Sequence, residues 1–230
     1  GDDKVDEEGE MKIRIFVCAF VMVSIAAIIY TWIIPKDDEK PPKNDFLKAC
    51  ETLNCEKSKS CTWIKIPDTN IDYQVLRPKD NNYYLRRNAS GKLDKNGAIF
   101  YDCDTSSGDG NAVIYGHNMQ NNKMFSELEF YRKEAFVKSH NFIYIMDKRG
   151  SKVSKQKYLV KAWMLIDDKF SKKKLDELKK SLVNRGRVQG GVSKIKCYGD
   201  IDGNKSIMLI TCASRRALED KRILVYAEKN

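Results

Sequence analysis

Histidine is scarce in this chain, with only His117 and His140 among 230 residues. Seven cysteines are present, but none of them forms a CxxC-type pair. A zinc site would need such pairs, or further histidines at ligand spacing. The sequence therefore predicts no metal centre, and it leaves few choices for any chemistry that joins a cysteine to a histidine.

The chain also lacks a nucleic-acid-reading motif and a Gly-rich phosphate loop, although its formal net charge is +10. Residues 1–10 hold six acidic residues against one lysine, so the rest of the chain carries +15. A basic surface attracts nucleic acid, anionic lipid headgroups or an acidic wall polymer through the same long-range field. Because no reading motif accompanies the charge, we expect no nucleic-acid partner.

Long hydrophobic runs are rare as well, and the exception is residues 15–34, which read IFVCAFVMVSIAAIIYTWII. At 1.5 Å per helical residue these twenty uncharged residues match a hydrocarbon core of about 30 Å. A cleaved signal peptide has a shorter apolar region of about 7–15 residues, so the run predicts a retained transmembrane anchor. Tyr30 and Trp32 suit its outer end.

The segments around this anchor suggest how the chain is organised. Residues 1–14 form an N-terminal tail, in which residues 1–10 precede a plausible initiator, Met11. Residues 35–45 (PKDDEKPPKND) are charged and Pro-rich, which is typical of a linker. We expect residues 46–230 to form a folded domain outside the cell, held to the cell membrane by a single span.

Eight short apolar runs with turn residues between them dominate the expected domain. They are residues 62–66, 71–76, 98–101, 112–115, 142–146, 158–166, 207–211 and 223–227. This spacing predicts a mainly β fold, a closed or nearly closed barrel of about eight strands. A short helix is expected at residues 46–53, and helical apolar spacing predicts peripheral helices within residues 123–140 and 171–185.

Three residues stand where such strands end or begin. His117 follows the apolar run AVIY, and Gly116 before it allows a sharp turn. Cys212 closes SIMLIT, and nearby cations favour the thiolate form that attacks carbonyls. Arg222 begins the following run, RILVYA, so adjacent antiparallel strands would bring its guanidinium beside the thiol. A cation there stabilises an oxyanion by roughly 3–4 kcal/mol per good donor.

Each assignment has a competing interpretation. Cys212 could equally be a buried structural cysteine, and Arg215 or Arg216 could serve in place of Arg222. His140 fits best as a partly exposed residue at a helix end. The spacing alone does not decide between these alternatives.

Taken together, the motifs resemble the sortase family, and class B sortases in particular, from about Trp63 to Ala227. Four segments carry the resemblance in order: TWIKIPDTNIDYQVL; YYLRRNASGKLDKNGAIFYD; AVIYGHNM leading into MFSELEFYRKEAFVKSHNFIYI; and IMLITC with RILVYA. The expected helix within residues 171–185 resembles the insertion that separates class B from class A.

The resemblance implies a cysteine transpeptidase that needs no cofactor. Such an enzyme cuts a C-terminal sorting signal after its threonine, holds the protein as a thioacyl intermediate, and passes it to an amine of a cell-wall precursor or a pilin. On this pattern Cys212 is the nucleophile, His117 the general acid and base, and Arg222 the oxyanion stabiliser.

Two other functions remain as alternatives. A cysteine peptidase would release its product to water, although the order His, Cys, Arg differs from that of papain-like enzymes, and no caspase motif surrounds the cysteine. A surface-binding barrel without activity would leave the Cys/His/Arg set unexplained. The sequence does not fix the disulfide state of the other cysteines outside the anchor, Cys50, Cys55, Cys61, Cys103 and Cys197.

Overall fold

The structure is a computed structural model that describes residues 60–105, 111–119, 122–168, 170–184, 188, 190–212 and 220–230. All of these lie in one compact unit, Pro41–Asn230. No helix within these ranges is both long and apolar enough to cross a membrane. The predicted tail, anchor, linker and helix at residues 46–53 lie outside the described residues.

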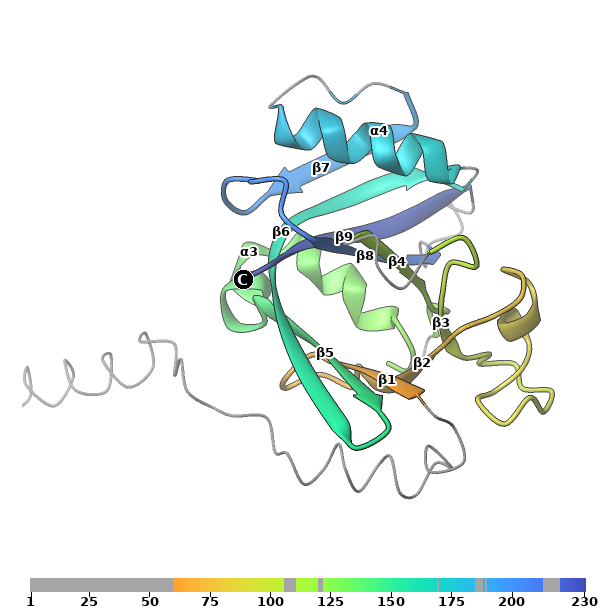
Figure 1. Ribbon diagram of the computed structural model, residues 1–230. Helices are drawn as coiled ribbons and strands as arrows, with labels where there is room; N and C mark the ends of the chain where they lie inside the picture. The colour runs from red at the N-terminus through yellow and green to blue at the C-terminus, as the bar shows by residue number, and fades with distance from the viewer. Residues whose placement is uncertain are drawn as a thin grey trace, which may run out of the picture. The chain divides into compact units, whose positions relative to one another are not determined.

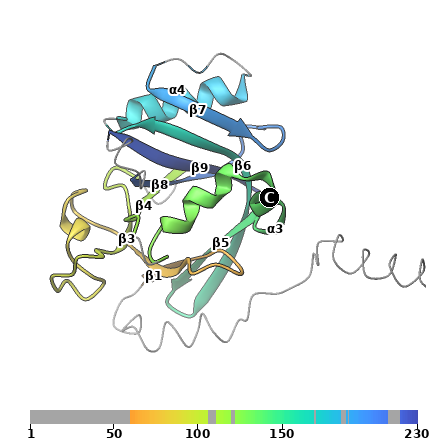
Figure 2. The same cartoon turned by 180° about the vertical axis from the view of Figure 1, so that it is seen from behind.

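The described residues form a β-barrel. Its strands are β1 (Ser60–Lys65), β2 (Asp72–Leu76), β3 (Ile99–Tyr101), β4 (Asn111–Tyr115), β5 (Phe142–Arg149), β6 (Lys152–Asp167), β7 (Val192–Cys197), β8 (Ser206–Cys212) and β9 (Lys221–Lys229). They are ordered β5-β1-β2-β3-β4-β8-β9-β6-β7 (Figures 1 and 2), and a further β5–β6 pairing closes a ring of eight. The predicted barrel of about eight strands is confirmed, since each of the eight apolar runs overlaps one of the eight strands in this ring.

Strand β6 closes the barrel because its two halves pair with different neighbours. Residues 152–159 pair with β5, and residues 158–167 pair with β9. The register shifts between Val160 and Ala162, as expected for a bulge that bends a strand from one partner to the next. The C-terminal half of β6, residues 162–166, also pairs with β7, which lies outside the ring.

The strands alternate between two apolar clusters, because successive side chains point to opposite faces. Ile207, Leu209, Ile223 and Val225 belong to the cluster inside the barrel. Their neighbours Met208, Ile210, Leu224 and Tyr226 belong to a second cluster on the outer face.

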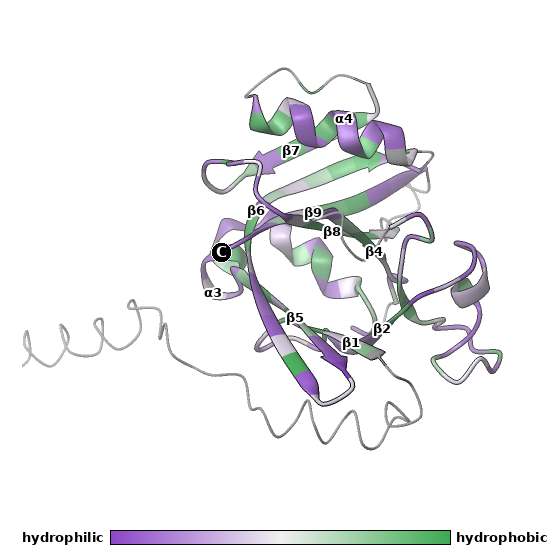
Figure 3. Ribbon diagram, in the orientation of Figure 1, coloured by the Kyte–Doolittle hydropathy of each residue, from purple (hydrophilic) through white to green (hydrophobic). Residues whose placement is uncertain are grey.

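Helix α4 (Lys172–Val183) covers this outer cluster through Leu175, Leu178 and Leu182, and its other positions are mostly charged (Figure 3). Ser171 caps the helix by accepting a hydrogen bond from the Lys174 amide. The prediction of a peripheral helix within residues 171–185 is therefore confirmed.

The region predicted as helical between residues 123 and 140 is divided in two. A 3-10 helix, η2 (Ser126–Arg132), is followed by a short α-helix, α3 (Glu134–Ser139). Lys133 separates them with an extended backbone, φ −99° and ψ 122°. Helix η2 packs Leu128 and Tyr131 against the barrel interior, and both side chains are fully buried. The apolar spacing in the sequence therefore reports this burial, although the helix is interrupted.

Candidate active site

The strands place the three predicted residues at one end of the sheet. Strands β4 and β8 are parallel neighbours, with Tyr115 opposite Ile210, so His117 and Cys212 each follow this pair by two residues. Strand β9 is the antiparallel neighbour of β8, and Cys212 is paired with Arg222. His117, Cys212 and Arg222 therefore come from three adjacent strands.

Side-chain alternation places these residues on the outer face. Ile210 and Leu224 belong to the outer cluster, and Cys212 and Arg222 are each two positions away from them along the same strand. Tyr115, two residues before His117, packs against that cluster too. The face that carries these residues at its end is thus the one that α4 covers, and the inner face is filled by the barrel core.

His117 is fixed by contacts on both its ring and its backbone. Nε2 lies 2.6 Å from the carbonyl oxygen of Leu85, which ends the 3-10 helix η1 (Tyr83–Leu85), and the His117 carbonyl accepts from the Phe125 amide at 2.8 Å. A carbonyl can only accept, so Nε2 carries a proton. Nδ1 is left to exchange protons with a reacting group.

Glycines make room for this arrangement. Gly97 has φ +61°, and a Cβ there would lie 2.5 Å from the Tyr84 carbonyl and 3.0 Å from Cδ2 of His117. Gly116 has no left-handed φ, but a Cβ would lie 2.4 Å from Cδ1 of Ile99 and 2.7 Å from Cδ2 of Phe125. A sharp turn at Gly116 was predicted from the sequence; the structure adds that the residue there must be small, because the packing is close.

Cys212 is exposed and its thiol is free. The side-chain amide of Asn118 donates to the backbone carbonyl of Cys212 at 2.9 Å, joining the segment after β4 to the end of β8. The structure therefore favours an accessible cysteine over the buried structural cysteine considered from sequence. Asn118 had received no role, although it stands inside the YGHNM motif.

Arg222 is partly buried and its guanidinium is oriented by an acid. Nε of Arg222 donates to Oδ1 of Asp168, which directly follows β6. Asp168 could not be predicted from the sequence, because its position beside Arg222 depends on the register between β6 and β9. Arg215 and Arg216 lie outside the described residues, so the choice between them and Arg222 remains a prediction.

His140 behaves as the sequence suggested. It is the C-cap residue of α3, and its ring stacks on Phe136 with centroids 4.0 Å apart. Nδ1 also lies 3.0 Å from the Phe136 carbonyl oxygen. These contacts give the ring a structural role at the helix end.

The remaining described cysteines differ in state. Cys61 is disulfide-bonded, whereas Cys103 and Cys197 are free and exposed. Loss of hydration raises the pKa of the Cys197 thiol, and the same effect, with the charges of Asp104 and Asp102, raises that of Cys103. Both are therefore poor thiolates. Cys50 and Cys55 lie outside the described residues.

Asp102, Cys103 and Asp104 bring their ligand atoms within 4.8 Å of one another. Both carboxylate oxygens of Asp102 already accept hydrogen bonds: Oδ2 from Asn81 and Tyr115, and Oδ1 from the Asp104 amide. This set of contacts fits a structural role that joins β3, β4 and the segment before η1.

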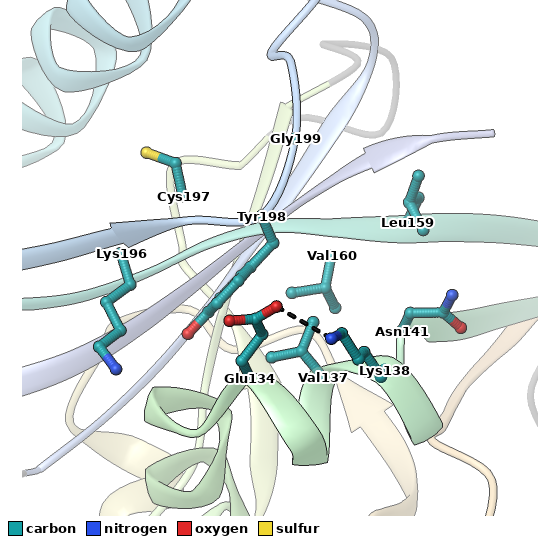
Figure 4. A pocket seen from close by; sticks show the side chains of 10 residues that line it. All are labelled: Glu134, Val137, Lys138, Asn141, Leu159, Val160, Lys196, Cys197, Tyr198 and Gly199. Atoms are coloured by element: carbon teal, nitrogen blue, oxygen red, sulfur yellow. Dashed lines mark ion pairs between the residues drawn. The ribbon is translucent and has the colours of Figure 1, made fainter.

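A cavity of about 550 Å³ lies between α3 and the strands β6 and β7 (Figure 4). Its lining includes Val137 and Val160, and the Glu134–Lys138 ion pair lies at one side. Tyr198 crosses the cavity and donates to the Tyr131 carbonyl, while the Cys197 side chain points away from Tyr198. The residues that line it include none of His117, Cys212 and Arg222, so this cavity is separate from the candidate active site.

Comparison with known proteins identifies the family and agrees with the barrel fold. Residues 64–230 match the sortase domain, and the chain therefore belongs to the sortase family. Sortase B of Listeria monocytogenes is 41% identical over 80 residues, which cover 34% of this chain and 32% of that protein. Sortase B of Staphylococcus aureus is 34% identical over 90 residues, covering 38% and 37%. The matches span about a third of the length of these curated relatives, and both relatives are class B.

Solved structures extend the likeness over most of the described chain. The X-ray structure of Clostridium perfringens sortase B matches with a TM-score of 0.61 and 27% identity, covering 78% of this chain and 98% of that one. A Staphylococcus aureus sortase B–substrate complex matches with a TM-score of 0.59 and 24% identity, covering 78% and 83%. This second likeness concerns the fold alone.

Proposed function

We propose that this chain is a cysteine transpeptidase of class B that cleaves a sorting signal after a threonine and transfers the protein to an amine. The observation that carries the proposal is the placement of His117, Cys212 and Arg222 at one end of three adjacent strands, with Cys212 and Arg222 in direct register. Membership of the sortase family supports the same chemistry.

In the first half-reaction the Cys212 thiolate attacks the carbonyl carbon of the scissile peptide bond. The carbonyl oxygen becomes an oxyanion, which the guanidinium of Arg222 stabilises. The C–N bond then breaks, and His117 gives a proton to the leaving amine as the thioester forms. Nδ1 is the ring nitrogen for this step, because Nε2 is engaged by the Leu85 carbonyl.

In the second half-reaction an amine attacks the thioester carbonyl. His117 now accepts the proton of the attacking amine, and the thiolate of Cys212 leaves. The site chemistry favours an unprotonated amine over water as acceptor because the amine is the stronger nucleophile. We propose a peptidoglycan precursor or a pilin as the source of this amine.

We also propose that the enzyme acts at the outer side of the cell membrane. The uncharged residues 15–34 support a single-span anchor, and the Pro-rich residues 35–45 support a linker that holds the domain away from the bilayer. A transpeptidase placed there would meet exported proteins and wall precursors together.

The test is a covalent capture experiment with the purified full-length chain in detergent. The chain is incubated with a library of sorting-type peptides, with and without an added amine such as triglycine, and examined by mass spectrometry. We expect an acyl adduct on Cys212 and, with triglycine, a ligated peptide. Peptide cleavage with water as the only acceptor would support the cysteine peptidase alternative, and the absence of any adduct or cleaved peptide would contradict both.

A further inference from the structure

We infer that Asp168 is a positioning residue for the oxyanion stabiliser, an inference that rests on the proposed role of Arg222. The two residues come from neighbouring strands: Arg222 is paired with Ile166 on β6, and Asp168 lies two residues further along. Cys212 is the partner of Arg222 on its other side. The arginine therefore lies between the nucleophile's strand and the acid's strand.

The contact fixes one edge of the guanidinium and leaves the other edge free. Nε of Arg222 donates to Oδ1 of Asp168 at 2.5 Å. Within the described residues, the two terminal nitrogens of Arg222 have no hydrogen-bond partner. Because the guanidinium is planar and rigid, fixing Nε also fixes the direction of these terminal N–H groups. They are the donors that can meet an oxyanion.

Asp168 is itself held in place by the backbone. Its amide donates to the carbonyl of Asp220 at 2.7 Å, so the acid is joined to the residue just before β9. A short, anchored acid removes rotational freedom from a long side chain before the substrate arrives. Donors oriented in advance stabilise a developing charge without reorganising during the reaction.

The preceding residue offers a matched control. Asp167 forms an ion pair with Lys221, directly beside the Asp168–Arg222 pair, and these two residues are register partners. The side chains of the control pair are 44% and 29% exposed, against 46% and 34% for Asp168 and Arg222. Pairs this exposed contribute little to stability, so the two substitutions should affect folding alike. In the register of β8 and β9, Arg222 faces Cys212 directly, whereas Lys221 lies one residue before Arg222 on β9 and so points to the opposite face of the sheet.

The experiment measures single-turnover acylation of Cys212 by a sorting-type peptide in the full-length chain. We expect Asp168→Ala to lower the maximal acylation rate about tenfold, a fraction of the loss caused by deleting a donor. The peptide concentration at half-maximal rate should stay unchanged. Asp168→Glu should recover part of the rate, because it restores a carboxylate to Nε. Asp167→Ala should acylate at the wild-type rate, with a thermal midpoint close to that of Asp168→Ala.

Arg222→Ala is measured alongside, so that the two claims can fail separately. If Arg222→Ala loses acylation but Asp168→Ala behaves like Asp167→Ala, the positioning role is wrong and the proposed function stands. A higher rate in Asp168→Ala would mean that the acid opposes the arginine, and this too would overturn the inference. Wild-type acylation by Arg222→Ala would overturn both the oxyanion role and the positioning role.

Discussion

Asn118 donates a hydrogen bond from its side-chain amide to the backbone carbonyl of Cys212 across 2.9 Å. This contact joins the segment that carries His117 to the end of the strand that carries the nucleophile. It restrains the backbone of Cys212 and leaves its thiol free. The relative position of the proposed acid and nucleophile thus depends on a third side chain.

Replacing Asn118 should therefore slow acylation. We expect Asn118→Ala to lower the acylation rate several-fold, because a hydrogen bond worth about 1 kcal/mol is lost where geometry matters. Asn118→Asp should be worse, since a carboxylate has no donor for the Cys212 carbonyl. Single-turnover acylation of the three proteins checks this order. Equal rates in all three would show that the contact is incidental.

The proposed nucleophile is tested by removing each free thiol found among the described residues. Cys212→Ala should abolish thioacyl capture and transfer, because no other nucleophile replaces the thiolate. Cys103→Ala and Cys197→Ala should keep normal turnover, since both thiols have raised pKa values and neither is among the residues proposed for the chemistry. Intact-protein mass spectrometry with a sorting-type peptide follows all three variants. Near-normal turnover in Cys212→Ala would remove the central assignment.

Substitutions of His117 and of Arg222 should affect the pH profile of acylation differently. Histidine exchanges protons near neutral pH, whereas arginine stays charged at every accessible pH. His117→Ala should lower the acylation rate and flatten its pH profile, while Arg222→Lys should lower the rate and keep the profile, because the charge remains but the planar fork is lost. Acylation across pH distinguishes the two.

Arg215→Ala and Arg216→Ala belong in the same series. If either variant lost acylation while Arg222→Lys acylated at the wild-type rate, the oxyanion role would belong to another arginine.

Gly116→Ala should destabilise the barrel. The new methyl group would lie 2.4 Å from Cδ1 of Ile99 and within 3 Å of the Phe125 ring, so packing around the site must shift. Overpacking of this kind costs about 1–3 kcal/mol in the free energy of unfolding. Chemical denaturation measures the loss. Gly150→Ala is the comparison, because no atom lies within 4 Å of its new Cβ, and any loss there reflects only its φ of +58°.

Stability should fall in strongly alkaline solution. Burial, with the negative charges of Cys197 and Glu134, raises the pKa of Tyr198 to about 12. Burial likewise raises the pKa of Tyr131 and Tyr226 well above the usual 10. The unfolded chain releases these protons near pH 10 and the folded chain does not, so the free energy of unfolding decreases as pH rises from about 10 to 12.

Urea unfolding at pH 9, 10 and 11 checks this direction. Tyr198→Phe removes one of the titrating groups, and its stability should therefore decrease less steeply with pH. A stability that rises with pH over this range would contradict the assignment.

Most strands of the barrel could be predicted from the hydrophobic pattern of the sequence, and strand β7 could not. The eight ring strands each carry residues of a buried cluster, so their apolar runs are visible in the sequence. Strand β7 was not predicted from the sequence because it has no apolar run. Lys194 and Lys196 are exposed, and Ile195 between them is 38% exposed. An edge strand outside the ring needs no apolar face, and lysines there protect against unwanted pairing.

In the candidate site, too, some residues could be predicted from the sequence and others could not. His117, Cys212 and Arg222 could be named because each stands at the end or start of an apolar run. The contacts from Leu85, Asn118 and Asp168 could not, because they depend on strand register and on a loop that returns from far away in the chain. Local sequence carries little information about such partners.

The parallel pairing of β4 with β8 has a consequence for the order of events during synthesis. Asn111 pairs with Ser206, which lies 95 residues further along the chain. Contacts between such distant segments form slowly, because a large loop must close first. During synthesis His117 is therefore made well before Cys212, and the two can come together only after β8 has been made and has paired with β4.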